Sequence, residues 1–179
     1  MSPLLPIHLL GSAVLRERAK DIATVDDEVR RLVEDMRETM QAYRGVGLAG
    51  NQVGIPRRVA IVQPDHEDLL VLINPEIVER DGEIEAEEGC LSIPDIYGDV
   101  RRAARIVVET TTLEGRRLQV PASDLKARAI QHEIDHLDGI LFLDRLSLFR
   151  RQLLLRKWKN QRRGETGLLR EEPETAAEA

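Results

Sequence analysis

Several residue types are scarce in this chain of 179 residues, and each scarcity excludes a class of protein. With one cysteine the chain cannot form an intramolecular disulfide, and a free thiol suits a reducing compartment. Residues 1–10 lack the basic stretch and apolar core of a secretory signal. No segment approaches the roughly 20 apolar residues that a membrane span needs. We therefore expect a soluble, cytoplasmic protein with neither a membrane nor DNA as its partner.

Aromatic residues make up only 3% of the chain, so leucine, isoleucine, valine and alanine must build the core. The length fits one domain. Apolar residues recur with helical spacing from Val29 to Tyr43, after start signals at Thr24 and Asp26. Strands are expected at 58–63, 69–73, 83–88, 105–112 and 117–120, with turns at Asn74-Pro75, Asp81-Gly82 and Glu114-Gly115. This order predicts an α+β fold.

The C-terminal part of the sequence divides into two segments. Residues 145–163 are basic and contain no acid, and a helix is expected over about 146–161. Its predicted apolar stripe consists of Leu146, Phe149, Leu153, Leu154 and Trp158. Residues 164–179 are acidic and rich in alanine, which predicts a disordered tail after a single domain over 1–163.

The segment His132-Glu133-Ile134-Asp135-His136 has the spacing of a metal site. Two histidines four residues apart lie one above the other on a helix, so both imidazoles can bind one ion. Glu133 can then act as a general base on a water without binding the ion. Ser123 or Asp124 can begin this helix and Gly139 can end it, and its apolar residues on two sides predict burial. The alternative is a solvated polar helix face.

A catalytic zinc-type site needs a third protein ligand and an open position for water. No histidine follows His136, so the sole thiol, Cys90 in Glu88-Gly89-Cys90-Leu91-Ser92, is the candidate. A lone cysteine can also be a buried apolar residue, although the preceding glycine allows a close approach of the backbone. A third segment, residues 45–52, reads Gly-Val-Gly-Leu-Ala-Gly-Asn-Gln and ends in Gln52, whose amide N–H could polarise a carbonyl oxygen.

In order and spacing, residues 45–52, 88–92 and 131–136 resemble the three motifs of the peptide deformylase family. The similarity covers most of the chain, from about Ile7 to beyond Arg145. One departure is visible, because the family usually has alanine where this chain has Gly50; we expect a slightly looser loop there. The resemblance implies mixed or antiparallel sheets packed around a central metal-binding helix.

The resemblance also implies an activity, the removal of the N-formyl group from formylmethionine of nascent polypeptides with release of formate. It implies that Cys90, His132 and His136 bind the metal and that Glu133 transfers protons. The Gln52 side chain and the Leu91 backbone N–H would stabilise the oxygen that gains charge. Val46, Gly47, Gly89, Leu125 and Ala129 would surround the methionine side chain. Leu125 and Ala129 lie on the helix side of the ligand histidines, although Leu125 could equally be ordinary core.

The family implies ferrous iron as the native ion, whereas affinity alone favours zinc, and nickel or cobalt can substitute. Asp135 is a candidate for orienting a ligand histidine, with Arg102 as its partner; the alternative is a solvated acid. The basic helix is either a solvated surface or, as the family suggests, a docking element for ribosomal RNA near the exit of the nascent chain.

Two other functions compete with deformylation on the residues alone. The first is a zincin-type endoprotease, against which stand the upstream cysteine and the absence of a downstream ligand. The second is a structural zinc domain that binds RNA through the basic helix. Structural zinc sites normally have four protein ligands, and the sequence offers three.

Overall fold

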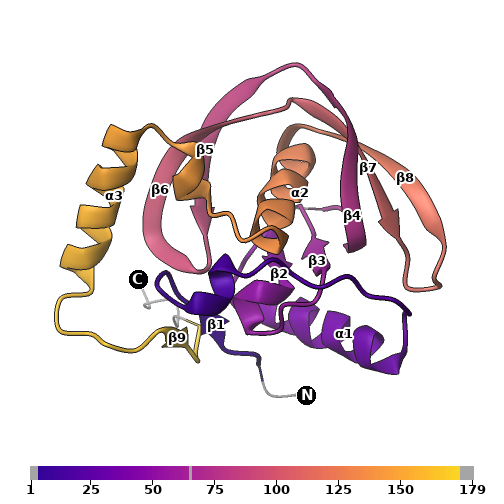
Figure 1. Cartoon of the computed structure of the whole chain (residues 1–179), viewed down its shortest axis with the longest axis horizontal. Coiled ribbons are helices and arrows are strands. Elements are labelled where there is room, and N and C mark those ends of the chain that lie inside the picture. Colours follow the sequence, from indigo (N-terminus) through magenta and orange to yellow (C-terminus); the bar gives the residue numbers. More distant parts are fainter. Residues whose placement is uncertain (1–3, 65, 174–179) are drawn as a thin grey trace.

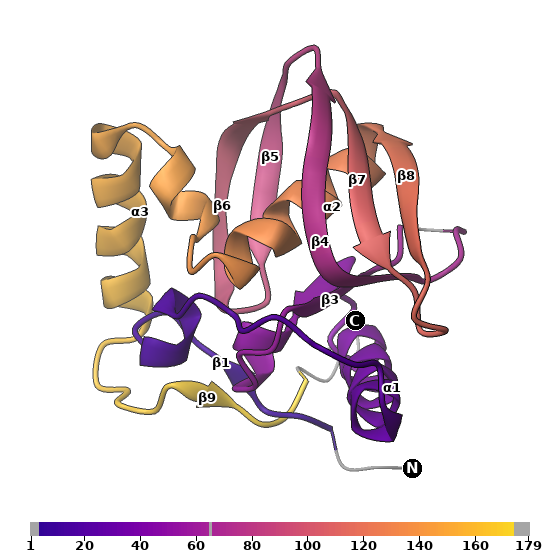
Figure 2. The same cartoon turned by 45° about the vertical axis from the view of Figure 1, so that its right-hand side comes forward.

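The fold is described from a computed structural model, which covers residues 4–64 and 66–173. Figures 1 and 2 show one helix, α2 (Asp124–Leu137), running through the middle of the molecule between two groups of strands. The fold is therefore α+β, as the sequence predicts. No helix within the described ranges is long and apolar enough to span a membrane.

A five-stranded antiparallel sheet lies on one side of α2, in the order β2-β3-β4-β7-β8. Its strands are β2 (Gly47–Ala49), β3 (Val59–Val62), β4 (Leu70–Asp81), β7 (Arg105–Thr111) and β8 (Arg117–Ser123). Ala127, Ile130 and Ile134 of α2 pack on this sheet against residues such as Leu72 and Val108. Because this apolar side of α2 packs on the sheet, the opposite side of the helix faces away from it.

On the other side of α2 lies a hairpin made of β5 (Ile84–Cys90) and β6 (Ile93–Arg102). Leu91 and Ser92 connect the two strands, and Cys90 pairs with Ile93. The pairing is irregular between Glu88 and Cys90, where Gly89 of β5 lies opposite the four extra residues 94–97 of β6. The hairpin thus brings the cysteine motif to its tip, facing α2.

Helix α1 (Asp27–Ala42) begins as predicted, because the Asp26 side chain accepts a hydrogen bond from the Val29 N–H at 2.9 Å. Its apolar face packs on β2 and β3. Short 3-10 turns also occur along the chain: η1 (Ala13–Arg16), η2 (Gly50–Val53) and η3 (Phe142–Arg145).

Helix α3 (Leu148–Gln161) lies against the outer side of β6 (Figure 1). The predicted apolar stripe is only partly correct. Leu146, Leu154 and Trp158 pack inward, whereas Phe149 and Leu153 are 74% and 54% exposed. Leu155, which the stripe omitted, takes a place on the inner side.

The predicted disordered tail differs from the structure over its first part. Leu169–Arg170 form a short strand, β9, which pairs antiparallel with β1 (Ile7–His8). Pairing with a partner strand gives this segment backbone hydrogen bonds that its polar composition does not reveal. Residues 174–179 of the predicted tail lie outside the described residues.

Two strand predictions also need correction. Asn74-Pro75 is not a turn but an irregularity inside β4, where Asn74 has a φ of 48° and the pairing register shifts. The Asn74 side chain forms two 2.8 Å hydrogen bonds with the backbone of Ile22, which holds the irregularity in place. Strand β6 was not predicted at all, because Pro94 and Gly98 interrupt its sequence pattern.

Candidate active site

Three side chains that the sequence singled out converge between α2 and the β5–β6 hairpin. The ligand atoms of Cys90, His132 and His136 all lie within 4.8 Å of one another. The Cys90 Sγ is 3.3 Å from His136 Nε2, which is 3.2 Å from His132 Nε2. One thiol and two imidazole nitrogens aimed at one point form a donor set that fits a divalent transition metal.

Glu88 orients one of these histidines, a role that the sequence analysis does not predict. Its carboxylate accepts a hydrogen bond from His132 Nδ1 at 3.0 Å, so Nε2 faces the cluster. The same carboxylate pairs with Arg102 at 2.9 Å and with Arg128 at 3.1 Å, and all four side chains are buried. Burial alone would raise the pKa of Glu88, but the hydrogen bonds from His132 and Arg102 lower it to about 2.

The predicted pairing of Asp135 with Arg102 is present, at 2.5 Å. Asp135 also binds Arg145 at 2.6 Å. Asp135 is buried, so the alternative of a solvated acid is wrong. It bonds to arginines rather than to a ligand histidine, and Arg102 joins it to Glu88. Asp135 therefore supports the cluster through Arg102.

Glu133 lies beside the cluster on α2 and is buried. Among the described residues its Oε2 has no hydrogen-bond partner. Burial raises the pKa of this carboxyl to about 7, the range in which one group can both accept and donate a proton near neutrality. Burial also lowers the pKa of His136, which favours the neutral imidazole that binds metals.

Gln52 reaches the site from η2. Its Oε1 accepts a hydrogen bond from the Ala49 N–H at 2.9 Å, which fixes the amide so that Nε2 faces Ser92 Oγ at 3.2 Å and Cys90 Sγ at 3.5 Å. The amide donor therefore lies next to the thiol. At Gly50, the first residue of η2, an added Cβ would lie 2.5 Å from the Ile55 carbonyl oxygen, so this backbone leaves little room for an alanine.

Two glycines let neighbouring groups approach this site closely. A Cβ on Gly47 would lie 2.4 Å from Glu133 Oε1, so β2 passes directly over the carboxylate. A Cβ on Gly89 would lie 2.6 Å from the Tyr97 ring, so the backbone before Cys90 packs against that ring. An alanine at either position would therefore force the neighbouring side chain to move.

A cavity of about 450 Å³ opens onto the cluster. Every residue proposed to surround a methionine side chain lines it: Val46, Gly47, Gly89, Leu125 and Ala129. Gln52, Cys90, Leu91, His132 and Glu133 line it as well. Leu125 is 51% exposed, so the alternative of an ordinary core position is wrong. The structure thus brings these residues together around one cavity, and His136 lies next to His132 in the cluster.

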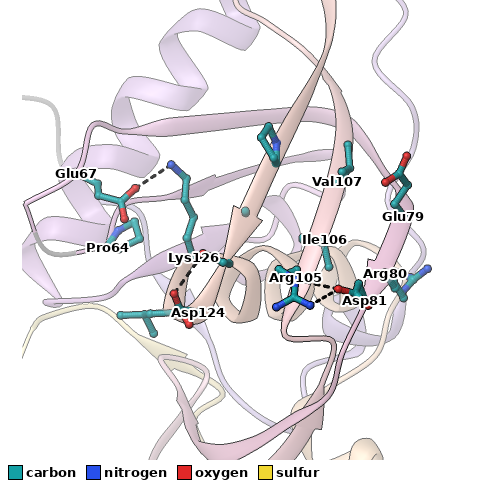
Figure 3. Close-up of a pocket in the computed structure, with 14 residues that line it drawn as sticks. Pro64, Glu67, Glu79, Arg80, Asp81, Arg105, Ile106, Val107, Asp124 and Lys126 are labelled. Atoms are coloured by element: carbon teal, nitrogen blue, oxygen red, sulfur yellow. Dashed lines mark hydrogen bonds and ion pairs between the residues drawn. The ribbon is translucent and has the colours of Figure 1, made fainter.

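A larger hollow, of about 830 Å³, lies over β4, β7, β8 and the start of α2 (Figure 3). Its lining residues pair with one another, Lys126 with Glu67 at 2.8 Å and Arg105 with Asp81. None of the metal-cluster residues lines it, and Leu125 is common to both cavities. The reactive groups therefore belong to the smaller cavity.

Comparisons of this chain with known sequences and with solved structures agree with one another. The sequence model described as polypeptide deformylase matches residues 4–152. A peptide deformylase of Alkalilimnicola ehrlichii is 50% identical over 157 residues, covering 86% of this chain and 88% of the relative. The crystal structure of a peptide deformylase from Legionella pneumophila superposes with a TM-score of 0.85 at 39% identity, covering 89% of this chain and 96% of that one. A Met-Ala-Ser-bound class I type b peptide deformylase from Acinetobacter baumannii has a TM-score of 0.78 at 36% identity, covering 82% and 100%.

Proposed function

The chain belongs to the peptide deformylase family, and from this premise we propose which of its residues carry out the reaction, which ion it uses and where it works. Members of the family are metal-dependent hydrolases that remove the N-formyl group from nascent chains, and this chain is such an enzyme. The zincin-type endoprotease and the structural zinc domain are thereby set aside. The observation that carries the residue assignment is the convergence of Cys90, His132 and His136 on one point, beside a cavity that Cys90 and His132 line.

We assign Cys90, His132 and His136 as the metal ligands. These three side chains would hold a divalent ion, which would act there as a Lewis acid toward water and the formyl carbonyl. Ferrous iron is the proposed ion, as the family implies, with zinc, nickel or cobalt as substitutes. Metal analysis of protein purified without oxygen, with activity measured per bound ion, tests this choice. Highest activity with zinc would contradict iron.

Glu133 is the proposed proton-transfer group. Water adds its oxygen to the formyl carbon while Glu133 takes the water proton, and the same carboxyl then protonates the leaving amine as the carbon–nitrogen bond breaks. The products are formate and a peptide with a free N-terminal methionine. The buried carboxyl, with a pKa of about 7, supports both halves of this role. The Gln52 amide and the Leu91 N–H are proposed to donate to the formyl oxygen as it gains charge.

The methionine side chain is proposed to occupy the cavity between Val46, Gly47, Gly89, Leu125 and Ala129. The related Acinetobacter baumannii enzyme was solved with Met-Ala-Ser bound, which supports a cavity of this kind for the deformylated product. An apolar wall suits an unbranched thioether side chain.

The test of the function is formate release from formyl-Met-Ala-Ser by metal-loaded protein, with the acetylated peptide as control. Glu133→Gln should keep the metal and slow turnover by about 10²-fold or more. Glu76→Gln, at an exposed position on β4, is the matched control and should change neither quantity. Unchanged turnover in Glu133→Gln would remove the role given to Glu133.

We also propose that the protein works in the cytoplasm on chains leaving the ribosome, with residues 1–163 as its single catalytic domain. The free Cys90 ligand favours a reducing compartment. Docking to ribosomal RNA is assigned to α3, where Arg156, Lys157 and Lys159 are exposed and have no ion-pair partner among the described residues. Phosphate contacts by such a cationic surface release counterions, so binding should weaken as salt rises.

A charge variant tests this docking better than a truncation, because removing the segment after Leu146 would also remove the buried Trp158 and strand β9. Replacing Arg156, Lys157 and Lys159 with glutamine should weaken ribosome binding and flatten its salt dependence. Activity on short peptides should stay unchanged. Replacing Arg18, Arg31 and Arg116, which are exposed elsewhere, is the matched control. Equal loss in both triple variants would argue against a specific role for α3.

A further inference from the structure

The segment that follows α3, residues 164–173, crosses back under the molecule, and we call it the C-terminal strap. Strand β9 of the strap pairs Arg170 with Ile7 and Leu169 with His8. The Leu9 N–H adds a 2.8 Å hydrogen bond to the Leu168 carbonyl. Figures 1 and 2 show β9 beside β1 in both views. The strap lies beyond residue 152, where the match to the deformylase sequence model ends.

Arg170 is held against the end of α1 by two contacts with Tyr43. The Tyr43 hydroxyl donates a 2.9 Å hydrogen bond to the Arg170 carbonyl oxygen. The guanidinium of Arg170 lies over the Tyr43 ring, 5.0 Å from its centroid. The ring is buried, so these contacts fix the position of the arginine head group.

Arg170 lines the same cavity as Cys90, His132 and Glu133. Arg44, an exposed neighbour of Tyr43, lines the cavity too. Glu87 and Asp95 line it from the β5–β6 hairpin. The cavity mouth is therefore cationic on the side of the strap and acidic on the side of the hairpin.

We propose that Arg170 is a substrate-binding residue that favours an acidic side chain among the first residues after formylmethionine. A planar guanidinium presents its N–H groups in its own plane, which matches the two oxygens of a carboxylate. Stacking on Tyr43 holds it in place before the substrate arrives, so less side-chain freedom is lost on binding. The assignment rests on the proposed function, because the methionine must occupy the cavity for the next residues to reach its mouth.

The selectivity should be modest. Glu171 and Glu172 follow directly and are exposed, so a substrate carboxylate competes with acids of the chain itself. Ion pairs at exposed positions change binding by a factor of about two to five. Because such pairs are screened, the preference should decline as salt increases.

The test compares formyl-Met-Glu-Ser amide with formyl-Met-Gln-Ser amide, which differ only in one carboxylate, and repeats the pair with the substitution one residue later. The measured quantity is the ratio of kcat/KM between acidic and neutral peptides, which does not depend on the fraction of active protein. Arg170→Gln should lower this ratio about two- to five-fold at one of the two positions, through KM. Arg170→Lys should keep part of the preference. Arg31→Gln, at an exposed site on α1 away from the cavity lining, is the matched control.

An unchanged ratio in Arg170→Gln at both positions would overturn the proposal. So would an equal loss on acidic and neutral peptides, because that result means that Arg170 only forms part of the wall. Failure of the wild-type enzyme to process the neutral peptide would instead contradict the proposed function.

Discussion

At the scale of single residues, the cluster depends on one carboxylate that several cations share. Glu88 binds His132, Arg102 and Arg128 in a buried network. Removing one partner of such a network leaves a buried charge unpaired. The loss of stability is then larger than the net stabilisation that the intact network provides. Glu88 therefore links the geometry of the metal ligands to the stability of the fold.

Replacing Glu88 with glutamine should weaken metal binding by about 10-fold or more, because a neutral amide orients His132 less strongly. Competition with a coloured chelator measures this affinity. The matched control is again Glu76→Gln, at an exposed acid on β4. Equal affinities in wild type and Glu88→Gln would show that His132 is oriented by other contacts.

The same carboxylate predicts a pH dependence of stability. The pKa of Glu88 is about 2 in the folded protein, against an ordinary value of 4.5. A group whose pKa is lowered by folding stabilises the protein above its unfolded pKa, so the stabilisation is present above pH 4.5 and lost towards pH 2. The shift corresponds to about 3 kcal/mol. Urea unfolding between pH 2 and 6 should show this loss in wild type, and Glu88→Gln should lack that part of the slope.

Gly47→Ala tests the close approach of β2 to the proton-transfer group. The added methyl carbon would meet Glu133 Oε1, so the carboxylate must move. Turnover should fall by about 10-fold or more while metal content stays at the wild-type level, because positioning of the proton-transfer group suffers and the ligands do not. Gly167→Ala, where nothing lies within 4 Å, is the control. Normal turnover in Gly47→Ala would mean that Glu133 adapts without loss.

Residue patterns predicted that Cys90, His132 and His136 come together, because histidine spacing on a helix is a local property and the cysteine had no competitor. They did not predict Glu88 as the partner of His132, although it lies within a recognised motif. That contact joins β5 to α2, two elements that are far apart in the sequence. Only the pairing of distant elements reveals it.

At the scale of elements, the regular helices were easier to predict than the strands. Helix α1 is predicted by its periodic apolar residues and by the Asp26 cap. The sequence predicts that the strand ends before Asn74-Pro75, whereas β4 continues through it. The hydrogen bonds of the Asn74 side chain to Ile22 stabilise this irregularity, and they come from a segment far away in the sequence. Strand β6 was missed, because proline and glycine are tolerated where the hairpin supplies the pairing.

Helix α3 carries two apolar residues that differ strongly in burial. Trp158 is 8% exposed and packs in a core with Phe142 and Ile96, whereas Leu153 is 54% exposed. Trp158→Ala should lower the free energy of unfolding by about 3 kcal/mol, since it leaves a cavity. Leu153→Ala should change it by less than about 0.5 kcal/mol. Chemical unfolding of both variants checks this, and similar losses would mean that α3 packs differently.

At the scale of the whole molecule, the C-terminal strap closes the fold through a two-residue ladder. Leu168 and Leu169 are 42% and 45% exposed, so little apolar surface holds the strap down. The Leu9 amide, bonded to Leu168, should therefore exchange its hydrogen through local opening. The Ile61 amide, in the middle of the five-stranded sheet, should exchange only near global unfolding. Hydrogen exchange at increasing urea separates the two, and equal opening free energies would contradict a weakly held strap.

The pairing of β1 with β9 has a consequence for the order in which the chain is synthesised. A ribosome makes the chain from its N-terminus at roughly 5–20 residues per second, so Ile7 leaves the ribosome long before Arg170 has been added. Cys90, His132 and His136, which form the cluster, are also synthesised before Arg170, so strand β1 still lacks its partner at that stage. The selectivity proposed for Arg170 would thus be among the last properties that a newly made molecule gains.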